Sequence, residues 1–89
     1  MGKQDKFAEK LRKTPTPKDV QWRELRAFLL SKGFEEIQKD GSRVRFILNE
    51  APDGGEPVRL FFHVPHPSPE VKPRALRAAV DTLTNRGVL

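Results

Sequence analysis

The sequence predicts an α+β fold, in which two helices cover one face of a three-stranded antiparallel sheet. Apolar residues recur at helical spacing in 19–32 and 73–86, and with a period of two between them, from 43 to 64. Glycine and proline separate these segments. The 89 residues leave room for one small domain, and the lack of cysteine excludes disulfides and thiolate metal sites.

Residues 1–18 are expected to form a helix and a proline-rich linker ahead of a domain that spans 19–89. Apolar residues at helical spacing indicate the helix over 3–13. Pro15 and Pro17 then break the helix and make the linker extended. The helix therefore either packs on the domain from outside or frays.

The first helix of the domain is expected to begin at an Asp19 cap and to run to about Lys32. Gly33 suits the left-handed position that ends a helix, and Phe34 stands where it would pin the chain back onto that helix. The spacing predicts a buried face made of Trp22, Leu25, Phe28 and Leu29.

Three strands are expected next. Phe34 and Ile37 frame a short first strand, and Asp40 with Gly41 supplies the turn of a hairpin. Residues 58–64 form the third strand, after a long turn. The second strand alternates Val44, Phe46 and Leu48, which enter the core, with Arg43, Arg45 and Ile47, which face solvent.

The last helix is expected over 73–86. Pro73 suits its first turn, and Gly87 stops it. Its buried residues are predicted to be Leu76, Val80 and Leu83.

The charge of the chain favours a polyanionic partner. Seventeen Lys and Arg against twelve Asp and Glu give a net charge of +5 and a pI near 10.0. Nucleic acid is the first candidate, an acidic protein or membrane surface is the second, and simple solubility is the alternative. Because the chain has no apolar run of membrane-spanning length and no secretory signal, we expect a cytoplasmic protein without a membrane partner.

Two histidines are the candidate catalytic residues. His63 ends the third strand. His66 lies in the loop 65–72, whose prolines are expected to prevent regular hydrogen bonding and to make the loop rigid and extended. Histidine has an ordinary pKa close to neutrality, so it can take a proton from a ribose 2′-hydroxyl or donate one to a leaving oxygen. His63 is alternatively a structural strand residue, whereas His66 has little core to serve.

Cationic and hydroxyl side chains near the histidines are the candidate RNA-binding residues. A meander places the second strand beside the third, so its arginines can stabilise charge on a phosphate, unless they are only a solvated sheet face. The full set is Ser42, Arg43, Arg45, Lys72 and Arg74. We expect no metal or cofactor, because two histidines without cysteine leave a zinc site short of ligands.

Taken in order, the motifs between about residues 20 and 88 resemble the HicA toxin family. The two most informative are Gly41-Ser42-Arg43, at the start of the second strand, and His63-Val64-Pro65-His66-Pro67, at the end of the third. The resemblance implies a double-stranded-RNA-binding-domain-like α-β-β-β-α fold. It also implies an mRNA endonuclease that halts translation and is neutralised by a HicB antitoxin, and it specifies no oligomeric state.

Arg43 departs from the family pattern, since many HicA proteins carry a catalytic histidine directly after Gly-Ser. Arginine cannot act as a general base near neutral pH, because its pKa is above about 12. The leading hypothesis is therefore a metal-independent endoribonuclease in which His66 and His63 transfer protons and Arg43 binds phosphate. The alternatives are a non-catalytic protein of the same fold that binds RNA or antitoxin, and a basic module that binds an acidic protein.

Overall fold

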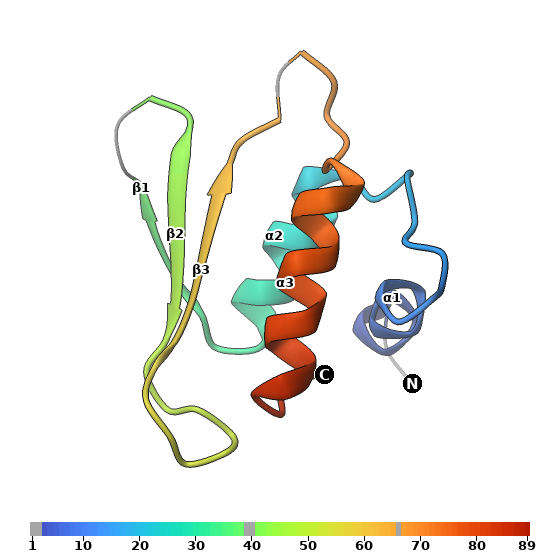
Figure 1. Cartoon of the computed structure of the whole chain (residues 1–89). Coiled ribbons are helices and arrows are strands. Elements are labelled where there is room, and N and C mark those ends of the chain that lie inside the picture. Colours follow the sequence, from blue (N-terminus) through green and yellow to red (C-terminus); the bar gives the residue numbers. More distant parts are fainter. Residues whose placement is uncertain (1–2, 39–40, 66) are drawn as a thin grey trace.

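The structure, a computed structural model, describes residues 3–38, 41–65 and 67–89. Its elements are α1 (Lys3–Leu11), α2 (Trp22–Ser31), β1 (Glu35–Gln38), β2 (Arg43–Leu48), β3 (Val58–His63) and α3 (Pro73–Asn85). The strands form one antiparallel sheet in the order β1-β2-β3. Figure 1 shows α2 and α3 on one side of the sheet, with α1 beyond them. The predicted α+β fold, with an α-β-β-β-α order after an additional N-terminal helix, is confirmed.

The core lies between the helices and one face of the sheet. Val44, Phe46 and Leu48 of β2 are buried, and the residues between them are exposed or half-buried, as the alternation predicts. Phe46 packs against the rings of Trp22 and Phe62, at centroid distances of 6.0 and 5.9 Å. Trp22 and Phe62 also contact each other at 5.4 Å, so three aromatic rings join α2 to β2 and β3.

The end of α2 follows the predicted geometry. Gly33 has φ = +96°, and its N–H donates to Leu30 O at 3.1 Å. The Phe34 N–H donates to Leu29 O at 3.1 Å, and both of these side chains are buried. This pair of hydrogen bonds is a Schellman motif, which turns the chain from α2 directly into β1.

The start of α2 differs from the prediction. The helix begins at Trp22 with Gln21 as its N-cap, and the Gln21 N–H donates to Glu24 Oε1 at 3.2 Å. Asp19, the predicted cap, instead forms an ion pair with Lys10 at 3.2 Å. The hydrogen bond from Lys10 lowers the pKa of Asp19.

Helix α1 packs on the domain, which is one of the two outcomes that the sequence allowed. Ala8 and Leu11 are buried in the same hydrophobic cluster as the rest of the core. The ring of Phe7 lies 5.4 Å from that of Phe28 in α2. The division of the chain into 1–18 and 19–89 stays a prediction.

The proline-rich loop is anchored more firmly than predicted. Proline lacks an N–H but keeps its carbonyl oxygen, and Pro69 O accepts a hydrogen bond from the Trp22 N–H at 2.8 Å. The Val71 N–H donates to Val20 O at 2.8 Å, so the loop forms an isolated bridge with the residues ahead of α2. The loop therefore has regular backbone hydrogen bonds at this point, contrary to the expectation.

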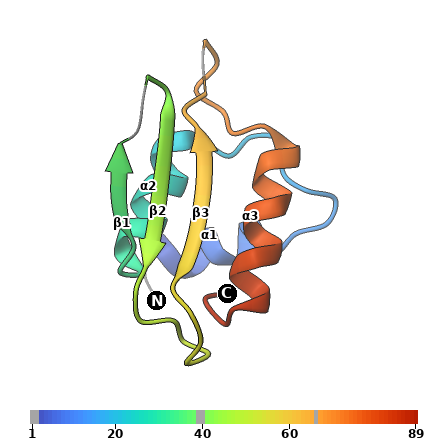
Figure 2. The same cartoon turned by 60° about the vertical axis from the view of Figure 1, so that its left-hand side comes forward.

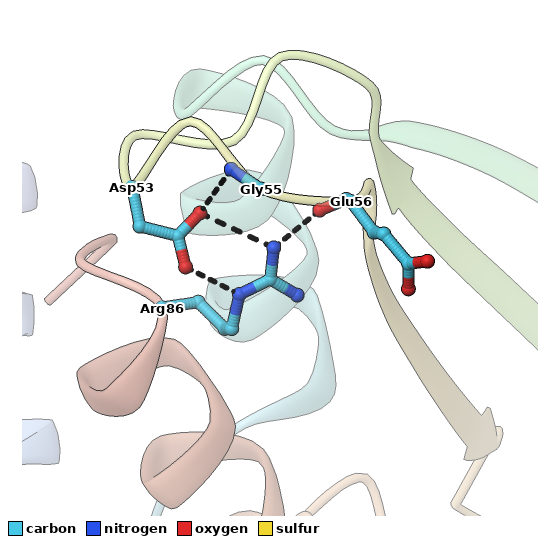
Figure 3. A network of polar contacts seen from close by, with 4 residues as sticks. All are labelled: Asp53, Gly55, Glu56 and Arg86. Carbon is cyan, nitrogen blue, oxygen red and sulfur yellow. Dashed lines mark hydrogen bonds and ion pairs between the residues drawn. The ribbon is translucent and has the colours of Figure 1, made fainter.

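An arginine ties the β2–β3 loop to the end of α3 (Figure 3). Arg86 Nε donates to Asp53 Oδ2 at 2.6 Å, and Arg86 Nη2 donates to Asp53 Oδ1 at 3.2 Å and to Glu56 O. The Gly55 N–H donates to the same carboxylate at 2.9 Å. These contacts, led by the hydrogen bond from Arg86, lower the pKa of Asp53 to about 2.

Replacing Phe46 by alanine should nearly unfold the protein, because Phe46 has no exposed surface and lies at the centre of the aromatic contacts. Truncating a buried phenylalanine typically costs about 3–5 kcal/mol, comparable with the whole stability of a domain this small. Phe61→Ala is the matched control on the neighbouring strand, because Phe61 is exposed. Urea denaturation followed by circular dichroism measures both, and Phe46→Leu supplies a milder variant. Equal losses for Phe46→Ala and Phe61→Ala would contradict this account of the core.

The Asp53 carboxylate should make stability depend on pH in acid. Its folded-state pKa of about 2 lies below the ordinary 3.8, so the unfolded chain binds a proton more readily. The stabilisation is fully present above the ordinary pKa and is lost as the pH falls through 2. In thermal melts, the difference in Tm between the parent and Asp53→Asn should therefore narrow as the pH falls from 3.8 to about 2. Asp81→Asn, which removes an exposed partner of Arg77, is the control, and a constant difference for Asp53→Asn would refute the prediction.

Candidate functional site

Three of the predicted site residues meet around one cavity at the end of the molecule where β3 ends and α3 begins (Figure 1). Ser42, His63 and Lys72 supply its polar and charged side chains, and its volume is about 420 Å³. The remaining lining is apolar and consists of Phe61, Phe62, Val64, Pro65, Val71 and Ala75. An apolar cavity with a few convergent polar groups is the usual form of a ligand site.

Backbone geometry places Ser42 in this cavity. Gly41 has φ = +58°, a left-handed conformation that glycine adopts without strain, and its carbonyl accepts a hydrogen bond from Gln38 Nε2 at 2.9 Å. Ser42 O then accepts from the Val64 N–H at 2.7 Å. This bond continues the pairing beyond the first residue of β2 and the last residue of β3, so Ser42 lies beside the exit of β3.

Lys72 is placed by the start of α3. It is the N-cap residue, with an extended backbone, and Pro73 occupies the first position of the helix. Val71, just before it, is buried and hydrogen-bonded to Val20. The Lys72 backbone is therefore fixed on both sides, and the residue borders the cavity opposite β3.

The two predicted arginines of β2, Arg43 and Arg45, lie on the uncovered face of the sheet. Arg43 is the Cα partner of His63 across β2 and β3, and Arg45 is the partner of Phe61. The Arg45 guanidinium carbon lies 5.2 Å from the centroid of the Phe61 ring, a cation–π contact. Arg45 Nε is buried and has no hydrogen-bond partner within the described part of the chain.

One predicted residue is not brought into this arrangement, and another cannot be placed. Arg74 is exposed in the first turn of α3 and does not line the cavity. His66 lies outside the described residues. The assignment of roles to all of these side chains stays a prediction.

Sequence reasoning missed Arg59 and Phe61, which share the uncovered face with Arg43 and Arg45. The signal was present, because β3 alternates buried and exposed residues from Val58 to His63. The paired phenylalanines at 61 and 62 obscured it, since both look like core residues. The register with β2 separates them, with Phe62 opposite the buried Val44 and Phe61 opposite Arg45.

Further features of the described residues bear on the class of protein. Over 3–38, 41–65 and 67–89, no group of three or more His, Cys, Asp or Glu residues is arranged to hold a metal ion. No helix in these ranges is long and apolar enough to cross a membrane. The fold and charge are those of a small basic α+β domain.

A family comparison extends this classification. The model described as HicA toxin of bacterial toxin-antitoxin matches residues 22–83. The match begins at the first residue of α2, ends in the last turns of α3 and leaves α1 outside. The chain therefore belongs to the HicA toxin family of bacterial toxin–antitoxin systems. We found no match among curated proteins or solved structures.

Proposed function

We propose that this protein is an mRNA-cleaving endoribonuclease that needs no metal ion. The observation that carries the proposal is the meeting of Ser42, His63 and Lys72 around one cavity, with Arg43 directly opposite His63 on β2. This arrangement sets a group that can transfer protons beside groups that bind anions. Membership of a toxin family and the net charge of +5 support RNA as the substrate.

The proposed reaction is attack by a ribose 2′-hydroxyl on the adjacent phosphate. A base removes the 2′-hydroxyl proton as the new O–P bond forms, and an acid protonates the leaving 5′-oxygen as the old bond breaks. The products are a 2′,3′-cyclic phosphate and a 5′-hydroxyl. His66 is the favoured proton-transfer residue, and it follows Pro65, which lines the cavity. His63 is its partner or orienter.

The remaining residues hold the phosphate. Arg43 and Arg45 carry permanent positive charge toward the solvent side of the sheet, where it can stabilise the charge that grows on the phosphate during attack. Ser42 assists from the cavity wall. Lys72 and Arg74 add charge at the N-terminus of α3, where the helix dipole also favours an anion.

In the cell, this activity would halt translation until an antitoxin of the HicB type binds the toxin. Membership of the HicA family supports that partner. Expression of the protein alone should then arrest growth, and co-expression with the antitoxin should relieve the arrest.

Arg43 favours a second candidate function, binding of RNA or antitoxin without cleavage. It stands where many HicA proteins have their catalytic histidine, and it cannot supply a base. The two functions separate in one pair of measurements on purified protein treated with EDTA. Cleavage products support the nuclease, whereas salt-sensitive RNA binding without products supports the binding protein.

Replacing His66 by alanine should abolish RNA cleavage and growth arrest, because this removes the proposed proton-transfer group. His63→Ala should lower cleavage at unchanged RNA affinity. The measurements are cleavage of a labelled RNA in EDTA, growth on expression, and a circular dichroism spectrum to show that each variant folds. If folded His66→Ala protein cleaves at the parental rate, the assignment of His66 is wrong.

The role of Arg43 predicts a graded series. Arg43→Ala should reduce cleavage by about 10²-fold or more, as loss of a charge-stabilising donor typically does. Arg43→Lys keeps the charge but not the two-pronged geometry, so it should retain part of the activity. Arg23→Ala, which removes an exposed arginine from α2 on the other side of the sheet, is the matched control. Equal activity for Arg43→Ala and Arg23→Ala would exclude Arg43 from the site.

A further inference from the structure

The face of the sheet that turns away from the helices is a surface of which the proposed cleavage site uses only the part around His63, Arg43 and Arg45. We call it the open face, and its side chains include Ile37, Arg43, Arg45, Ile47, Arg59 and Phe61. Figure 2 shows the strands in front, with α1 and α2 behind them. His63 lies at the end of the same face, beside Arg43.

Phe61 is the most exposed large apolar side chain in the described part of the chain, with 67% of its surface accessible. The other aromatic residues described are buried or half-buried. Arg45 covers part of the ring through the cation–π contact, and Ile37 follows Arg45 in the same row across the sheet. Because the ring faces solvent, it contributes nothing to the core and its free surface is accessible to a ligand.

The arginines of the open face form no ion pairs with the described residues. Arg43, Arg45 and Arg59 share the face with one carboxylate, Glu35, and none of the three forms an ion pair within 3–38, 41–65 and 67–89. By contrast, the arginines that do pair with carboxylates lie in or after the helices, as Arg26 and Arg86 do. The face therefore has positive charge available for an anionic partner.

We propose that the open face binds single-stranded RNA, with one base stacked on Phe61 and the backbone held by Arg59 and Arg45. A π-face stacks on any base, and interleaved arginines neutralise the phosphates, which is the general design of single-strand binding surfaces. A base that stacks on a ring must be unpaired, so the partner is a single strand rather than a duplex.

The open face is continuous with the cavity. Phe61 and His63 lie on this face and also line the cavity, and they are two positions apart on β3, or about 7 Å. A nucleotide on Phe61 therefore puts a neighbouring phosphate within reach of His63 and Arg43. The proposal takes its choice of polyanion from the proposed function, but its new claim concerns Phe61 and Arg59, to which that function gives no role.

Binding is best tested with RNA that cannot be cleaved. A single-stranded 2′-O-methyl oligonucleotide lacks the attacking hydroxyl, so its affinity reports binding alone, by fluorescence anisotropy. Phe61→Ala should weaken affinity on the order of 10-fold, the usual effect of losing one stacked base. Phe61→Trp should restore it. A 2-aminopurine base in the oligonucleotide should be quenched on binding by the parent protein and less so by Phe61→Ala.

The proposed phosphate contact of Arg59 is tested by measuring how the affinity for RNA depends on salt concentration. Arg59→Ala should weaken binding and reduce the dependence of log affinity on log salt by about 0.7, the value for one phosphate contact on a single strand. Arg23→Ala removes the same charge from α2, on the far side of the sheet, and should leave that slope unchanged. Both Phe61 and Arg59 are exposed, so these variants should keep the parental Tm.

Several results would overturn the proposal: no binding of the oligonucleotide by the parent at low salt, equal affinity for Phe61→Ala, or tighter binding of a duplex. Loss of antitoxin binding by Phe61→Ala at unchanged RNA affinity would show that the face docks protein instead. Failure of the proposed function gives a different pattern, in which unmodified RNA stays intact while the 2′-O-methyl strand still binds through Phe61.

Discussion

The strict alternation of β2 is the constraint on which the rest of the structure depends. Val44, Phe46 and Leu48 all point toward the helices, and a shift of pairing by one residue would turn Arg43 and Arg45 into the core. Burying those charges without partners would cost far more than such a small domain can lose. The register is therefore fixed. The same alternation that builds the core also places the arginines together on the uncovered face.

The core holds the candidate site in place directly, because one of its packed aromatic residues, Phe62, also lines the cavity. Phe62 precedes His63 in the chain and packs against Trp22, whose N–H is bonded to Pro69 of the proline-rich loop. The exit of β3, the start of α2 and the loop are thus held together by the side-chain and backbone contacts of one residue, Trp22. At the opposite end of the molecule, Arg86 and Asp53 hold the β2–β3 loop to α3. Stability at that end does not involve the side chains of the site.

Local patterns in the sequence predicted the elements well, because their causes are local. The period of two in β2, the Gly33–Phe34 ending of α2 and Pro73 at the start of α3 each act within a few residues. The predictions failed where a partner distant in the sequence determines which contact a residue makes. Asp19 is a good capping residue, but Lys10 binds it. Gln21 is the N-cap residue instead, and it also forms an isolated β-bridge with Glu70 of the proline-rich loop.

The candidate site was predictable as a set of residues but not as an arrangement. The opposition of Arg43 and His63 follows from the hairpin register, which depends on the β2–β3 loop. That loop is held by Asp53 and Arg86, which are 33 positions apart in the chain, and no short pattern indicates such a pair. Phe61 was missed for a related reason, since the face it occupies is set by the same register.

Because residue 43 is an arginine, the proposed site assigns phosphate binding to β2 and proton transfer to β3 and the residues that follow it. The guanidinium group of arginine is a permanent cation, so in the proposed mechanism β2 contributes phosphate binding and no proton transfer. In the proposed mechanism, proton transfer is then assigned to His63, at the end of β3, and to His66, three positions further along the sequence. In a site with histidine at position 43, the same side chain would have to bind and to react. With arginine there, Arg43 adds a third cation to Arg45 and Arg59 along the open face. The proposed binding of RNA and its proposed cleavage then rest on different side chains.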